Sequence, residues 1–523
     1  MENTGMNQKE KRNYYIEAGY LLLSAFAILF VASRSSLLYP CNDWNDANSY
    51  FSVGKGLFHG KVPYRDIFDQ KGMYLYFFYG LAYLLSHTTF AGVFVLELVL
   101  ATADLLSIYR ILSLYLKKDL ALLLSPLPLA AAFASNSFYY GGSAEEICLP
   151  FLLAGFYLIL RYFKEEYPEK VMDDKALLFG GLLAGMVANI KFTVLGFFFA
   201  WMMCIAIAFL VKKDLKGAVK ACGIFLLGMF VPFVPWILYF ALQHALYDWY
   251  WGYVYINVFA YSNLNGEGPG LSERVYILAK LLYWVIRKNL CYFVFVIPGV
   301  LWYLLQGKKK RILPAVSMIC LCFFLFLGIY VGGSELPYYA LPLSVFTPLG
   351  FILLGKVLEW IYGLCIRQRE STQTSVKTAK NIRHGTFLVC GAAILVIMEV
   401  LLCNLSMNFP FHKVKKEDHF LYKLAAVVEQ EEAPTLLNIG CLDAGLYTVC
   451  DIVPTCQWFQ TQTVIMDTVL SEQERYIREG QIQFVLARDS YPDVIFERYE
   501  LAAEEDWTEN GQDFTYYLFR RKD

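Results

Sequence analysis

The feature that most constrains this chain is a series of long apolar segments spread over its first 404 residues. A helix needs roughly 20 consecutive apolar residues to cross a bilayer. Hydrophobic residues make up 57% of the 523 residues and charged residues 17%, against about 25% charged in soluble domains. This composition excludes disordered, fibrous and nucleic-acid-coating proteins and argues against a soluble enzyme. The eleven expected spans are 15–33, 89–115, 120–138, 144–163, 176–190, 193–211, 217–241, 289–306, 312–331, 338–362 and 384–404.

The short apolar run 73–86 decides the topology. As a helix it reaches about 21 Å, less than the hydrocarbon core of about 30 Å. If it does not cross and the N-terminus is cytoplasmic, every strongly basic short loop lies inside, as the positive-inside rule requires. We therefore expect a juxtamembrane or re-entrant helix at 73–86, with the loop 34–72 and the C-terminal part outside. This topology favours a multi-pass protein of a plasma membrane, most simply a bacterial one.

The composition changes after about residue 405. Apolar runs shorten to strand length at 435–439, 484–487 and 514–519, and a polar, helix-like run lies at 471–479. We expect an all-α polytopic membrane domain over 1–404 and a small extracytoplasmic α/β domain over 405–523. Cys441, Cys450 and Cys456 lie in this domain, and the sequence leaves open whether they form a disulfide.

The outer loop 34–72 holds most of the candidate chemistry. Asp43 and Asp46 are three residues apart, so one helical turn would place both carboxylates on one face. Paired carboxylates suit a general base, since each raises the pKa of the other. They also suit a divalent cation, and the sequence leaves the need for a metal open. Arg65, Asp69 and Lys71 follow in the same loop. A solvated loop with capping Asp residues is the alternative, but the density of charge favours a functional site.

More polar groups reach the same side from later segments. Glu145 and Glu146 begin a span, where either an active site or the helix dipole accounts for acids. Lys191 lies between two outward-converging spans, where it suits a phosphate or extends its charge to the interface. The simplest interpretation of Tyr338 and Tyr339 is that they belong to the interfacial aromatic belt.

Several of these motifs carry a family resemblance. The acidic pair after the first span resembles the GT-C superfamily of polyprenyl-phosphate-sugar-dependent glycosyltransferases, as does Gly-x-x-Pro-Tyr-x-Asp-x-x-Asp-x-Lys-Gly over 60–72. The segment 141–146 and Lys191 also look like the protein O-mannosyltransferase-like and aminoarabinose lipid A transferase groups. The resemblance covers most of the membrane part and, loosely, the outer domain.

The resemblance implies a site as well as a fold. An Asp of the first outer loop would act as base or position the acceptor, with Asp43 the best match and Asp46 the second. Basic residues at the membrane surface would hold the lipid phosphate, which points to Lys71 and Lys191. Many relatives have His-Tyr at 338–339, so the Tyr-Tyr here departs from the pattern.

The expected function is inverting transfer of a sugar from a polyprenyl-phosphate donor to an outer glycan, lipid or protein acceptor. Asp43 would take the proton of the acceptor hydroxyl. Lys71, Lys191 or Arg65 would stabilise the phosphate leaving group, whose charge grows in the transition state. The remaining substrate-binding candidates are Asp69, Glu145, Glu146, Tyr338 and Tyr339.

Two other classes stay open. A transporter or flippase would need polar groups near the midplane of the spans, where only Glu97 and Asp104 are charged. A noncatalytic assembly protein for envelope glycans would leave Asp43 dispensable.

Overall fold

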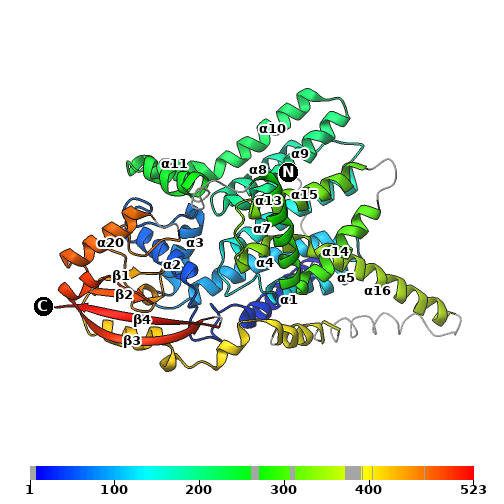
Figure 1. Ribbon diagram of the computed structural model, residues 1–523. Helices are drawn as coiled ribbons and strands as arrows, with labels where there is room; N and C mark the ends of the chain where they lie inside the picture. Colours follow the sequence, from blue (N-terminus) through cyan, green and yellow to red (C-terminus); the bar gives the residue numbers. More distant parts are fainter. Residues whose placement is uncertain are drawn as a thin grey trace.

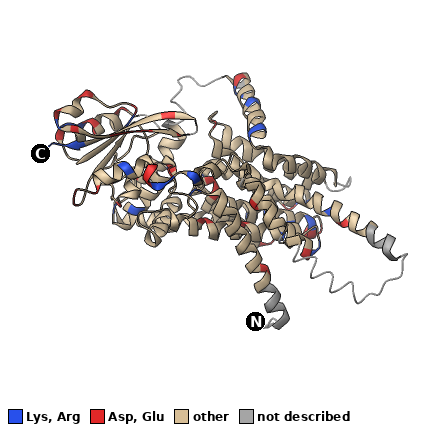
Figure 2. Cartoon of the chain, turned by 90° about the horizontal axis from the view of Figure 1, so that it is seen from below, with Lys and Arg blue, Asp and Glu red and all other residues tan. Residues whose placement is uncertain are grey.

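The computed structural model describes residues 8–260, 270–306, 312–370, 390–391, 393–402, 404–463, 466–509 and 511–522. A large body of helices meets a small β-sheet that carries the C-terminus (Figure 1). In Figure 2 most of the helical body is uncharged, while acidic and basic side chains lie on the sheet module, where it meets the helices, and towards the ends of several helices.

The helices of the first part follow the expected apolar segments. Their bounds are α1 (Gln8–Ala32), α2 (Asn45–Phe58), α3 (Met73–Leu85), α4 (Ala91–Ser113), α5 (Lys118–Leu124), α6 (Pro126–Phe133), α7 (Ala144–Arg161), α8 (Asp174–Ala188), α9 (Gly196–Val211), α10 (Leu215–Phe230), α11 (Val234–Leu242), α12 (Leu246–Trp249), α13 (Leu271–Lys288), α14 (Leu290–Leu305), α15 (Ile312–Tyr330) and α16 (Thr347–Glu370). Short 3₁₀ segments at Phe192–Leu195 and Pro337–Phe346 precede α9 and α16.

Seven helices among the described residues are long and apolar enough to cross a membrane, or eight if α13 and α14, bent by 112°, form one span. The chain is therefore a multi-pass membrane protein. Fewer segments than the eleven expected are long and apolar enough to count as membrane spans, because some helices are short or interrupted. The segment 120–138 divides at Pro126 into α5 and α6, α8 has only 15 residues, and 384–404 lies partly outside the described residues.

The short helix α3 packs directly against α2. A Cβ built on Gly54 would lie 2.6 Å from the backbone nitrogen of Gly80, so the two helices touch through their backbones. Such an approach is open only to residues without a side chain. The run 73–86 thus forms a 13-residue helix packed on protein, as its length indicates.

The C-terminal sheet has the strand order β1-β2-β4-β3. Its strands are β1 (Leu436–Ile439), β2 (Phe484–Arg488), β3 (Tyr499–Glu509) and β4 (Gln512–Arg521). β1 and β2 are parallel, and β4 pairs antiparallel with both β2 and β3. Helices α18 (Phe420–Val428), α19 (Leu446–Val449) and α20 (Asp467–Glu479) complete the module, which confirms the small α/β fold. The boundary between residues 404 and 405 stays a prediction.

The sheet module docks on one face of α2. Residues 48, 52 and 55 recur at helical spacing and therefore share a face, and residue 49 lies beside it. The four hydrogen bonds join Asn48 to Thr448 (2.8 Å), Ser49 to Gln460 (2.6 Å), Ser52 to Asp443 (2.6 Å) and Lys55 to the carbonyl oxygen of Tyr447 (2.8 Å). One face of α2 therefore contacts the C-terminal module over most of the length of the helix.

Candidate functional site

Two turns distant in sequence place Lys71 beside Lys191. The backbone N–H of Gly72 donates to the carbonyl of Ile190 (3.2 Å), and that of Tyr74 donates to the carbonyl of Asn189 (3.2 Å). The end of the first loop is thus hydrogen-bonded to the turn between α8 and α9. The two lysines that the sequence suggests as phosphate ligands, Lys71 and Lys191, therefore lie near each other at this junction.

Asp46 lies in the first turn of α2 and faces the same junction. The hydroxyl of Tyr338 donates to its carboxylate at 2.6 Å. Burial lowers the pKa of the Lys71 ammonium, but the nearby carboxylates of Asp46 and Asp69 outweigh this effect and raise that pKa. Lys71 therefore stays cationic next to a half-buried carboxylate.

Lys191 pairs with an acid from the start of α7. Its ammonium forms an ion pair with Glu145 and lies 4.0 Å from the centre of the Tyr339 ring and 5.3 Å from that of Tyr338. Tyr338 is buried, so its interpretation as part of the interfacial aromatic belt is wrong. Its hydroxyl donates a hydrogen bond to Asp46. These contacts bring Asp46, Lys71 and Lys191 into one polar cluster, which we call the lysine cluster.

The backbone of Lys71 is fixed from both sides. The hydroxyl of Tyr64 donates to its carbonyl oxygen (2.6 Å), and its N–H donates to the hydroxyl of Tyr76 (2.7 Å). Tyr76 in turn donates to Asp69 (2.9 Å), whose pKa is raised by burial. Asp69 thus acts on Lys71 both through charge and through a tyrosine that orients the loop.

Several buried polar atoms around the lysine cluster have no hydrogen-bond partner among the described residues. They are the Tyr50 hydroxyl, Gln70 Oε1, Glu145 Oε2 and Asn189 Oδ1. Burying such groups without partners costs free energy. Their concentration around two lysines is typical of a site that completes its hydrogen bonds with a polar ligand.

Glu146 lies apart from that cluster and supports the start of α7. The Ser143 hydroxyl caps the helix by accepting from the N–H of Glu146 (3.0 Å), and the carboxylate of Glu146 accepts from the N–H of Gly142 (2.8 Å). These contacts match the helix-start interpretation, whereas Glu145 joins Lys191.

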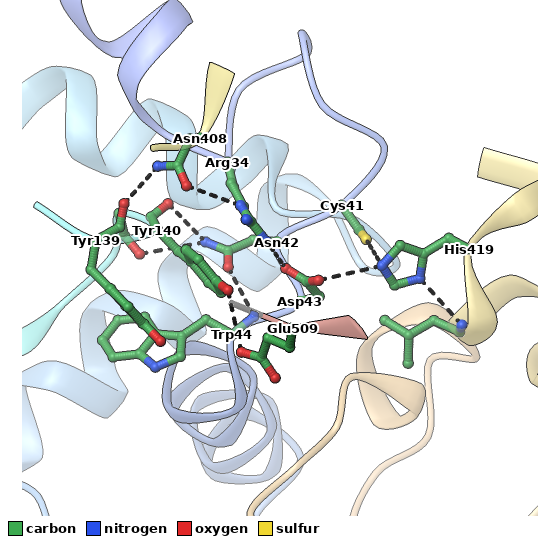
Figure 3. A network of polar contacts seen from close by, with 12 residues as sticks. Arg34, Cys41, Asn42, Asp43, Trp44, Tyr139, Tyr140, Asn408, His419 and Glu509 are labelled. Carbon is green, nitrogen blue, oxygen red and sulfur yellow. Dashed lines mark hydrogen bonds and ion pairs between the residues drawn. The ribbon is translucent and has the colours of Figure 1, made fainter. Parts of the chain in front are cut away.

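Asp43 belongs to a different network (Figure 3). It precedes the first residue of α2, so the expectation that Asp43 and Asp46 share a helical face is wrong. Its oxygens contact Arg34 (2.5 Å) and the Nε2 of His419 (3.4 Å). Burial raises the pKa of Asp43, but Arg34 and His419 outweigh burial and bring that pKa below its ordinary value.

The Asp43 network extends to both parts of the chain. Arg34 donates from Nε to Asn408 (3.0 Å), whose amide donates to the carbonyl of Tyr139 (2.6 Å). The guanidinium of Arg34 lies 3.5 Å from the ring centre of Tyr140 and 4.1 Å from that of Phe411. Sequence reasoning missed Arg34, Asn408 and His419. Arg34 gave a signal, as a charge at the end of an apolar span, but Asn408 is 374 residues away from it.

Arg65 is not brought to the lysine cluster. It is exposed, pairs with Asp66 (2.8 Å) and donates to the carbonyl of Gln243 (2.8 Å). In the described ranges no group of three or more His, Cys, Asp or Glu residues could hold a metal ion. Cys441, Cys450 and Cys456 are free thiols.

No protein-family model matches the sequence, and no curated protein matches it. Solved structures with the same fold include ArnT from Cupriavidus metallidurans in the apo state, with a TM-score of 0.59 and 14% identity over 96% of this chain and 98% of ArnT. ArnT bound to undecaprenyl phosphate gives a TM-score of 0.58 and 13% identity, with 95% and 98% of the two chains covered. ArnT is a GT-C glycosyltransferase. The likeness extends over nearly the whole of both chains, and this protein therefore has the GT-C fold that its motifs indicate.

Proposed function

We propose that this protein transfers a sugar from a polyprenyl-phosphate donor to an acceptor at the outer face of the membrane. The observation that carries the proposal is the meeting of Lys71, Lys191 and Asp46 at one junction. ArnT, which has the same fold, has been solved with undecaprenyl phosphate bound. A lipid phosphate is the natural ligand of two lysines at the outer ends of membrane helices.

In this proposal the lysines act on the leaving group. The bond from the anomeric carbon to the phosphate oxygen breaks as the acceptor oxygen attacks from the opposite side, which inverts the anomeric centre. Negative charge develops on the departing lipid phosphate. Lys71 and Lys191 stabilise that charge, and the attraction strengthens as the bond breaks.

Asp46 is the better placed of the two candidate bases. It is half-buried and its carboxylate contacts only Tyr338 among the described hydrogen-bond and ion-pair partners. Asp43 is occupied by Arg34 and His419, and its lowered pKa makes it a weak proton acceptor. We therefore propose Asp46 as the group that takes the acceptor proton and Asp43 as a group that holds the loop, and Arg65 receives no phosphate-binding role.

The membrane orientation is part of the proposal. A cytoplasmic N-terminus and an outward C-terminal module place the lysine cluster at the outer surface and the strongly basic short loops inside. A plasma membrane of a bacterium fits this arrangement.

The test is a transfer assay on the full chain in liposomes, supplied with a panel of undecaprenyl-phosphate sugars and read as released undecaprenyl phosphate. Asp46→Asn should slow release by about 10²- to 10⁴-fold, the range for a lost general base. Asp66→Asn is the matched control, because Asp66 pairs with Arg65 away from the lysine cluster. Normal release by Asp46→Asn together with loss in Asp43→Asn would return the base to Asp43. No release from any donor by folded wild-type protein would favour a transporter or an assembly protein.

A further inference from the structure

A cavity of about 380 Å³ lies between the first loop and strand β3. None of its lining residues belongs to the lysine cluster, and several come from the C-terminal module. Its walls include Arg34, Asp43, Tyr140, Phe411, Trp507 and Glu509. Its volume lies at the small end of ligand pockets, which fits one terminal unit of a substrate better than a long chain.

Buried charged groups form the floor of this cavity. The side chains of Arg34 and Asp43 are 9% and 3% exposed, and both residues line the cavity. Arg34 uses Nη1 for Asp43 and Nε for Asn408. A guanidinium carries five N–H groups, so a ligand in the cavity can accept a further hydrogen bond from Arg34.

The strand β3 supplies an aromatic face and more acceptors. Trp507 is half-exposed and packs on the ring of His419 at 4.2 Å between centres. Glu509 accepts from the hydroxyl of Tyr140 at 3.3 Å through Oε1, and burial raises its pKa to about 7. Asp506 also lines the cavity. An open indole ring beside carboxylates and a guanidinium matches the mixed apolar and polar faces of a sugar ring.

The charge balance argues against an anionic ligand. Asp43, Asp506 and Glu509 are three carboxyl groups against the single guanidinium of Arg34, which Asp43 already neutralises. A phosphate or a carboxylate would be repelled, whereas hydroxyl groups can donate to the carboxylates and accept from Arg34. The lysine cluster, with its two cations, suits the lipid phosphate better.

A short chain of aromatic contacts links this cavity to Asp46. Tyr140 of the wall stacks on Tyr139 at 4.4 Å, and Tyr139 packs on Tyr338 at 5.9 Å. Tyr338 donates to Asp46. Asp43 lies only three residues before Asp46. The packed rings of Tyr140, Tyr139 and Tyr338 therefore connect the cavity wall to the proposed base.

We propose that this cavity binds an uncharged sugar unit of a glycan acceptor, with Trp507 stacking on the ring and Glu509 and Asp43 accepting from its hydroxyl groups. The proposal rests on the proposed glycosyltransferase function and adds the class of acceptor. It gives the C-terminal module a direct part in choosing the substrate.

Binding is tested without catalysis. The full chain in lipid nanodiscs, without donor, is titrated with methyl glycosides of glucose, galactose, mannose and N-acetylglucosamine, and contact is read by saturation-transfer NMR. At least one neutral glycoside should bind. Trp507→Ala should weaken it about tenfold or more, in line with the loss of one stacking aromatic. Glu509→Gln, which keeps the volume of the side chain, should weaken it less. Phe496→Ala is the control, since Phe496 is an exposed aromatic packed on Phe519 outside the cavity.

The outcomes separate this inference from the proposed function. No binding of any neutral glycoside, equal binding by Trp507→Ala, or tighter binding of glucuronate or glucose 1-phosphate would overturn it. In the transfer assay, Trp507→Ala should raise the KM for the bound sugar about tenfold. Donor hydrolysis with no sugar binding would retain the glycosyltransferase and reject this acceptor site. Sugar binding without donor hydrolysis would reject the acceptor role together with the glycosyltransferase.

Discussion

Gly72 sets the distance between the two turns that carry Lys71 and Lys191. A Cβ at this position would lie 2.0 Å from the carbonyl oxygen of Asn189 and 2.3 Å from its carbonyl carbon. Both atoms are backbone, so no side chain can rotate away. The φ and ψ of Gly72 are -78° and 153°, which alanine adopts freely. Gly72→Ala is therefore a purely steric change.

The size of the effect follows from these distances. Ordinary contacts of a Cβ begin at 3.4 Å, so the two turns must separate by roughly 1 Å, and a misplacement of that size costs about 10²-fold in rate. The hydrogen bonds from Gly72 to Ile190 and from Tyr74 to Asn189 would lengthen at the same time. Each contributes about 1 kcal/mol, so we expect a stability loss of about 2 kcal/mol.

The assay measures release of undecaprenyl phosphate and thermal unfolding on the same preparation. Gly223→Ala is the matched control, because a Cβ there meets nothing within 4 Å. In the helix α10 that change should stabilise the protein by up to about 1 kcal/mol and leave the rate intact. A Gly72→Ala variant with wild-type rate would refute the idea that this contact positions the lysine pair.

Three other predictions concern buried ionisable groups. Lys191→Met should lower the free energy of unfolding by about 3–5 kcal/mol because it leaves Glu145 buried without its partner. Adding Glu145→Gln should recover most of this stability in a denaturant titration but should not restore the transfer rate. Recovery of both would show that the pair has only a structural role. Burial raises the pKa of Asp443 from 3.8 to about 6, so the native state binds this proton more tightly than the unfolded state. Its stabilising effect is complete below pH 3.8 and is lost as the pH rises through about 6, a change of about 3 kcal/mol that Asp443→Asn should remove from the pH dependence of unfolding. Lys55→Met should remove the hydrogen bond to the Tyr447 carbonyl and the ion pair with Asp451 (3.0 Å), cost about 2 kcal/mol and speed proteolytic release of the C-terminal module. Unchanged proteolysis would show that this end of α2 does not hold that module.

The membrane helices could be predicted from the sequence because each of them must meet the same requirement, a run of apolar residues long enough to cross the bilayer. Apolar length and the placement of basic loops are local properties, and the helices α1, α4, α7 and α9 appear where those properties indicate. The weaker cases are interrupted segments. At Pro126 a span divides into two short helices, since proline cannot continue the hydrogen bonds of a helix interior.

The sheet was predicted for three strands and missed for one. β1, β2 and β4 are apolar or alternate, and they fall at the expected runs. β3 reads YELAAEEDWTE and is exposed along much of its length. Its acidic residues have low strand propensity, so the sequence indicates no strand there. Its pairing with β4 is a tertiary effect, which explains why Trp507 and Glu509 did not stand out as candidates.

The site shows the same division between local and long-range information. Loop chemistry identified the residue types, and the structure brings Lys71, Lys191, Glu145 and Asp46 together as one cluster. The loop sequence could not show that Asp43 and Asp46 have different surroundings. That difference depends on where α2 begins and on His419, which lies 376 positions after Asp43. Spacing alone described a carboxylate pair, whereas folding gives the two acids different partners.

The helix α2 explains why the acids have to differ. Its first turn presents Asp46 to the lysine cluster, while its polar face from Asn48 to Lys55 holds the C-terminal module. Asp43 lies just before the helix and, through His419, joins the same module. In the proposals above, the first turn of α2 carries Asp46 of the donor site, and Asp43, just before the helix, lines the acceptor cavity. The buried polar contacts along α2 then fix the geometry between the two substrates, which an apolar interface would leave free to slide.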